Sequence, residues 1–88
     1  MDEKEDKKVA DAPGAEMVVR RALDTQYADK LKNVKFRKAW YSSEGKQEFW
    51  DVEGNFELKK GNDKKRNFRY QVDPWRGNIL GYEEIPIK

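Results

Sequence analysis

The hydrophobic period of this chain changes once, near Lys32. Before that point, apolar residues recur every three to four positions, which is typical of an amphipathic helix. Pro13 suits a first helical turn, and Asp11 or Gly14 is a candidate cap. The pattern predicts a helix over about residues 15–30. Its apolar face consists of Ala15, Val19, Ala22, Leu23 and Tyr27.

From Val34 onward the period is two, as in β-strands that bury one face. Four alternating stretches are separated by polar turns near residues 43–46, 60–64 and 74–77. Lys38 breaks the first stretch, which predicts a bulge there. Gly54 takes an inward position without a side chain, which suggests room for the helix or a bulky neighbour. The expected inward residues are Val34, Phe36, Trp50, Val52, Phe56, Leu58, Phe68, Tyr70, Val72 and Tyr82, and Trp40 is a further candidate on the first strand.

One helix followed by four closely connected strands predicts an α+β fold. In this fold, the N-terminal helix packs on a four-stranded antiparallel β-meander. Residues 2–8 are all charged, so residues 1–12 are expected to form a disordered charged tail. Residues 13–88 then form a single domain, for which a monomer or a weak dimer is expected.

The composition narrows the classes of function. Charged residues make up 41% of the chain, yet the formal net charge is only +2. Cysteine and histidine are absent, which removes thiolate and imidazole metal ligands and the commonest general base. We therefore expect no cofactor, no bound metal and no enzymatic activity. No apolar run reaches membrane-spanning length, so the chain as written is expected in the cytoplasm, or outside it if it is a fragment of a longer precursor.

Two acids on the second strand have the spacing of a catalytic pair. Asp51 and Glu53 share one face and lie roughly 7 Å apart. The alternation places both in water, whereas a general acid needs a desolvated carboxyl. The favoured interpretation is cross-strand pairing on a solvated face with Lys35, Arg37 and Arg69.

The hairpin over residues 59–69 carries the densest positive charge in the sequence. Such a patch could hold the phosphates of a nucleic acid. Lysines on an exposed hairpin also prevent edge pairing, and the small net charge favours that interpretation. Nucleic-acid binding is therefore the less favoured alternative. The basic residues are Lys59, Lys60, Lys64, Lys65, Arg66 and Arg69.

Aromatic residues outside the clear alternation indicate a surface that contacts another protein. Trp75 and Arg76 sit at the tip of a turn whose backbone is fixed by Asp73, Pro74 and Gly77. The alternative is that Trp75 folds back as a lid on the core. The predicted partner-binding residues are Trp40, Tyr41, Trp75 and Arg76.

The last hairpin of the chain reads FRYQVDPWRGNILGYEE and resembles the closing hairpin of PepSY-type domains. In those domains a strand ends in Val-Asp, the turn ends in Gly and an apolar strand follows. The matching positions are Val72, Asp73, Gly77, Ile79 and Leu80. With the helix and the stretch FWDVEGNFEL, the resemblance covers most of residues 18–84.

The resemblance implies a cystatin-like module that binds or inhibits a protein, often a peptidase, or regulates near the cell surface. It implies no catalytic residue. Members of that family usually lie outside the cytoplasm, and Trp75-Arg76 replaces small polar residues in the turn. The stretches WDVEGNFEL and RYQVDPWRGNILGY are also similar to small accessory proteins of gas-vesicle assembly, which are non-catalytic partners.

Overall fold

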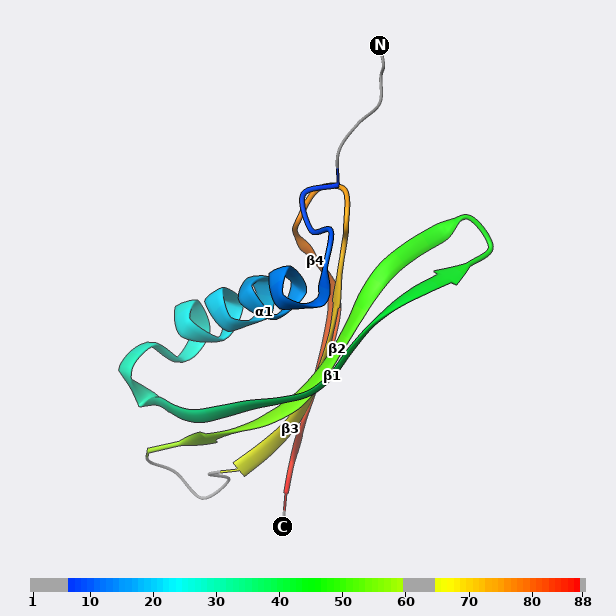
Figure 1. Ribbon diagram of the computed structural model, residues 1–88. Coiled ribbons are helices and arrows are strands. Elements are labelled where there is room, and N and C mark those ends of the chain that lie inside the picture. The colour runs from blue at the N-terminus through cyan, green and yellow to red at the C-terminus, as the bar shows by residue number, and fades with distance from the viewer. Residues whose placement is uncertain (1–6, 60–64, 88) are drawn as a thin grey trace.

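The computed structural model describes residues 7–59 and 65–87 (Figure 1). Helix α1 (Ala12–Tyr27) and a 3-10 turn (Ala28–Lys30) precede strands β1 (Leu31–Glu44), β2 (Gln47–Leu58), β3 (Lys65–Val72) and β4 (Ile79–Pro86). The strands form one antiparallel sheet in the order β1-β2-β3-β4, and α1 lies on one face of it. The α+β class and the meander are confirmed. The turn expected at 60–64 lies outside the described residues.

Helix α1 begins at Ala12 because Asp11 caps it. The Oδ1 atom of Asp11 accepts a hydrogen bond of 2.9 Å from the N–H of Gly14. The helix ends at Tyr27, where Ala28 adopts a φ of 53° and the chain continues as the 3-10 turn. Its buried residues are Ala15, Val19 and Leu23. Within the described residues, no helix has the length and apolar character needed to cross a membrane.

The residues immediately before α1 pack on the sheet. We call residues 7–10 the N-terminal arm. Val9 is only 3% exposed, and its N–H donates to the carbonyl of Pro74 at 3.0 Å. Its own carbonyl accepts from the indole N–H of Trp50 at 2.9 Å. The described part of the expected tail is therefore anchored, because the apolar side chain of Val9 is buried although the residues before it in the sequence are charged. Residues 1–6 of the expected tail lie outside the described residues.

Strand β1 changes face part-way along its length. A register shift beside Lys38 matches the predicted bulge. After it, Tyr41 pairs with Trp50 on the helix side, whereas Trp40 pairs with Asp51 on the outer face. Trp40 and Tyr41 therefore point to opposite sides of the sheet.

The core lies between α1 and the inner face of the sheet, and it differs from expectation at Tyr82. This side chain is 58% exposed, although it stacks on Tyr70 with ring centroids 5.0 Å apart. The expected burial was wrong because β4 is an edge strand and α1 packs chiefly on β1, β2 and β3. The core consists of Val9, Ala15, Val19, Leu23, Val52, Phe56, Leu58, Phe68, Tyr70 and Val72.

Gly54 occupies a place where a larger residue does not fit. An added Cβ would lie 2.1 Å from the carbonyl oxygen of Lys35 and 2.7 Å from the ring of Phe68. The space is thus taken by β1 backbone and a bulky ring. Gly54→Ala should lower the free energy of unfolding in urea by about 1–3 kcal/mol.

Gly81→Ala is the matched control for this substitution, since its Cβ would meet only the Oε1 atom of Gln71, at 3.5 Å. The control should stay within about 0.5 kcal/mol of the parent protein. Equal stability of the two variants would mean that β1 moves away from Gly54 at little cost.

Candidate functional site

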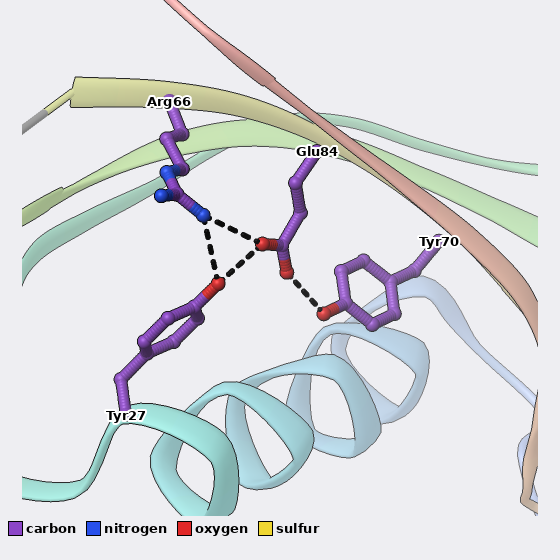
Figure 2. Close-up of polar contacts among 4 residues, drawn as sticks. All are labelled: Tyr27, Arg66, Tyr70 and Glu84. Atoms are coloured by element: carbon purple, nitrogen blue, oxygen red, sulfur yellow. Dashed lines mark hydrogen bonds and ion pairs between the residues drawn. The ribbon is translucent and has the colours of Figure 1, made fainter. Parts of the chain in front are cut away.

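A carboxylate beneath β4, that of Glu84, gathers hydrogen-bond donors from α1 and β3 (Figure 2). The hydroxyl of Tyr70 donates to Oε2 at 2.8 Å, and the hydroxyl of Tyr27 donates to Oε1. The Nη1 atom of Arg66 lies 3.4 Å from Oε1 and 3.2 Å from the Tyr27 hydroxyl. The Glu84 side chain is only 8% exposed. We call these four residues the Glu84 cluster.

The Glu84 cluster holds a charge in place and is poorly suited to proton transfer. Burial and the hydrogen bond to Glu84 raise the pKa of Tyr27 to about 12. The same causes raise the pKa of Tyr70 well above its ordinary value. Both hydroxyls therefore keep their protons near neutral pH and serve as donors to the carboxylate. The network joins the end of α1 to β3 and β4, although the buried Nε atom of Arg66 has no hydrogen-bond partner within it.

The raised tyrosine pKa values predict a loss of stability at alkaline pH. An unfolded tyrosine loses its proton near pH 10, whereas folded Tyr27 keeps its proton up to about 12. The contribution to stability is therefore complete below pH 10 and is lost as the pH rises through the folded pKa. Urea unfolding between about pH 9 and pH 12 measures this fall. The free energy of unfolding of Tyr27→Phe should fall less over the same range. An equal fall in the variant and the parent protein would mean that other groups cause the pH dependence.

The outer face of the sheet holds a second buried charge. Arg69 binds Asp51 through two hydrogen bonds, from Nε at 2.9 Å and from Nη2 at 2.7 Å. Asp51 is only 1% exposed, so the expectation that it faces water was wrong. It lies in one cross-strand row with Trp40 and Gln71. The alternation of polar and apolar residues predicts which face of the sheet a side chain is on, but it does not predict whether neighbouring side chains shield it from water.

Within the described residues, the two arginines of the predicted basic patch lie on opposite faces of the sheet. Lys60 and Lys64 lie outside the described residues. Arg66 points to the helix side within the Glu84 cluster, whereas Arg69 points to the outer face and pairs with Asp51. Both arginines are thus already bound to carboxylates, on opposite faces of the sheet.

The β3–β4 turn presents Trp75 on a fixed backbone. The Oδ1 atom of Asp73 accepts from the N–H of Trp75 at 2.8 Å and from that of Arg76 at 3.3 Å. The N–H of Gly77, at a φ of 76°, donates to the Asp73 carbonyl at 2.8 Å. Pro74 is buried, but Trp75 is 40% exposed. Trp75 is therefore not a lid over the core.

Tyr41 lies close to Trp75, and a lysine lies against both rings. The Nζ atom of Lys7 is 4.5 Å from the ring centroid of Tyr41 and 5.2 Å from that of Trp75. The Tyr41 hydroxyl donates to Glu48, and its ring packs edge-on against Trp50 at 5.2 Å. We call Tyr41, Glu48 and Trp75 the aromatic site, over which Lys7 lies.

Of the predicted partner-binding residues, the structure brings Tyr41, Trp75 and Arg76 to one end of the sheet and separates Trp40 from them. Trp40 lies on the outer face, with the Nζ atom of Lys38 at 5.4 Å from its ring. The aromatic site is thus assembled from the β1–β2 hairpin and the β3–β4 turn, and Lys7 of the N-terminal arm covers it.

A cleft of about 320 Å³ adjoins Trp75. Its lining includes the carboxylates of Glu48 and Asp73 and the ammonium of Lys46, so the charges around it are on balance negative. A second cleft, of about 510 Å³, lies between the β1–β2 hairpin and β4 and includes Phe49 and Leu80. Both clefts are therefore bounded by the β1–β2 hairpin and by the β3–β4 hairpin.

No protein-family model, curated protein or solved structure matches the chain. Within residues 7–59 and 65–87, no group of three or more carboxylates is placed as metal ligands would be.

Proposed function

We propose that the protein is a non-enzymatic module that binds another protein through its aromatic site. The observation that carries this proposal is the exposed ring of Trp75 on a turn that Asp73 already fixes. A side chain held in this way loses little conformational entropy when a partner docks. Tryptophan and arginine are also residue types that often dominate interface energies, and Arg76 is next to Trp75.

The state of the buried charges supports a role without catalysis. The Glu84 carboxylate is saturated with donors, and the tyrosines that bind it keep their protons at neutral pH. Asp51 is neutralised by Arg69. A general acid or base needs a group that exchanges its proton near the working pH.

The resemblance to PepSY-type domains leads to the same class of function. It would make the chain a protein-binding or regulatory module, with a peptidase as one type of partner. Nucleic-acid binding through residues 59–69 is less favoured, because Arg66 and Arg69 are engaged with carboxylates.

Substitution of Trp75 tests the proposal. Trp75→Ala should weaken capture of the specific partner from extracts of the source cells by about tenfold or more. Because the ring is 40% exposed, stability should change little. Affinity capture followed by urea unfolding measures both effects.

Ile85→Ala is the control, since Ile85 is 56% exposed on β4 outside the aromatic site. It should retain the partner. A partner held equally well by the parent protein and by Trp75→Ala would contradict the proposed function.

A further inference from the structure

We infer that the aromatic site receives an alkylammonium group, namely the side chain of a lysine or methylated lysine in the partner protein, and that Lys7 occupies the site in the free protein. This inference rests on the proposed function, because it names the ligand of the same site. The Lys7 ammonium of the N-terminal arm would then compete with the partner's ammonium group for the same two rings.

The first support is the position of the Lys7 ammonium against two rings. Its Nζ atom lies 4.5 Å from the Tyr41 centroid and 5.2 Å from the Trp75 centroid. Both distances are within the range over which the electron-rich face of an aromatic ring attracts a cation. Sites built from several rings are the usual way in which proteins recognise methylated ammonium groups.

The second support is the charge beside the rings. The hydroxyl of Tyr41 donates a hydrogen bond to Glu48, so the Glu48 carboxylate lies next to the Tyr41 ring. Glu48 and Asp73 also line the 320 Å³ cleft beside Trp75, where Lys46 is the opposing charge. A cation that enters along this cleft therefore meets two carboxylates.

The third support is the way in which Lys7 is delivered. The arm is anchored by Val9, through its bonds to Pro74 and Trp50, and not by the Lys7 side chain. The Lys7 ammonium can therefore leave the rings while the arm stays in place. A ligand that must displace it binds with an apparent affinity reduced by the fraction of sites that Lys7 fills.

The chain contains a matched comparison on its other face. Lys38 lies over Trp40 at 5.4 Å, with one ring in place of two. A lysine over a single aromatic ring is an ordinary surface contact. Lys38→Ala therefore controls for the loss of a lysine near a tryptophan.

The test is a titration of the full chain with a short peptide that carries one trimethyllysine, followed through the indole N–H signals in NMR spectra. Parallel titrations use the same peptide with unmodified lysine and with a neutral tert-butyl analogue. The Trp75 signal should shift saturably with a charged peptide, and the Trp40 signal should not. Whichever charged peptide binds more tightly identifies the form of lysine that the site prefers.

Lys7→Ala should bind the preferred charged peptide about three- to sixfold more tightly, because the internal competitor is gone. Lys38→Ala should bind like the parent protein. Trp75→Ala should lose binding, as followed through the indole N–H of Trp50, which packs against Tyr41. The inference is overturned if Lys7→Ala shows no saturable shift at Trp75, if its affinity is unchanged, or if the neutral analogue binds equally well.

These outcomes are separate from failure of the proposed function. A partner that depends on Trp75 but is indifferent to Lys7→Ala and to added trimethyllysine peptide would overturn the ammonium inference and leave protein binding at this turn in place. A partner that is indifferent to Trp75→Ala would overturn the proposed function itself.

Discussion

Arg69→Met should lower the free energy of unfolding by about 3–5 kcal/mol at neutral pH. The substitution leaves the Asp51 carboxylate, which is 1% exposed, without the two guanidinium hydrogen bonds that compensate its charge. Methionine keeps much of the aliphatic packing, so the loss reports mainly on the unpaired charge. Urea unfolding monitored by tryptophan fluorescence measures the effect.

Two further variants determine whether burial of Asp51 causes that loss. Arg37→Met removes an exposed ion pair, 3.5 Å from Glu53, and should cost less than about 1 kcal/mol. Combining Arg69→Met with Asp51→Leu removes the buried carboxylate together with its half-exposed partner and should recover much of the lost stability. Similar losses for Arg69→Met and Arg37→Met would mean that water reaches Asp51 once Arg69 is removed.

Glu84→Ala should cost about 2–4 kcal/mol, since it deprives several partly buried donors of one acceptor. The hydroxyls of Tyr27 and Tyr70 and the guanidinium of Arg66 all lose their shared carboxylate. Denaturant unfolding with circular dichroism at the helix signal measures the loss. The end of α1 should be the first part to exchange its amide protons, because the cluster is what joins it to β4.

The neighbouring acid on the same strand is the control for Glu84. Glu83 is exposed and points to the opposite face, so Glu83→Ala should stay within about 0.5 kcal/mol of the parent protein. If both glutamate variants have the same stability, the Glu84 cluster is a surface contact and does not hold α1 in place.

The architecture could be predicted from the sequence because it follows from local periodicity. The change of period near Lys32 separates helix from strands, and the empty inward position of Gly54 indicates a close approach of backbone or ring. The register beyond the bulge could not be predicted in the same way. One extra residue in the bulge beside Lys38 exchanges the faces of Trp40 and Tyr41. Periodicity alone does not show at which residue the bulge lies.

The candidate sites depend on contacts between distant residues and were predicted less well. A signal for the Glu84 cluster was present, because Glu83 and Glu84 are adjacent on a strand and one of them must face inward. The burial of Asp51 had no such signal, since it depends on cover from other strands. Lys7 could not be placed from the sequence, because a single apolar residue, Val9, brings the arm to the aromatic site.

The anchored arm also determines how the protein should be handled in an experiment. The arm brings Lys7 to the β3–β4 turn, whereas the N–H of Ile87 donates to the carbonyl of Lys65 at the far end of the same hairpin (Figure 1). A tag or surface linker joined directly to Lys7 would start beside Trp75 and would crowd it. The same tag attached behind Ile87 leaves from the opposite end of the molecule. Immobilisation through the C-terminal side therefore presents the aromatic site outward, and comparing the two orientations on a sensor surface locates the docking end without any substitution.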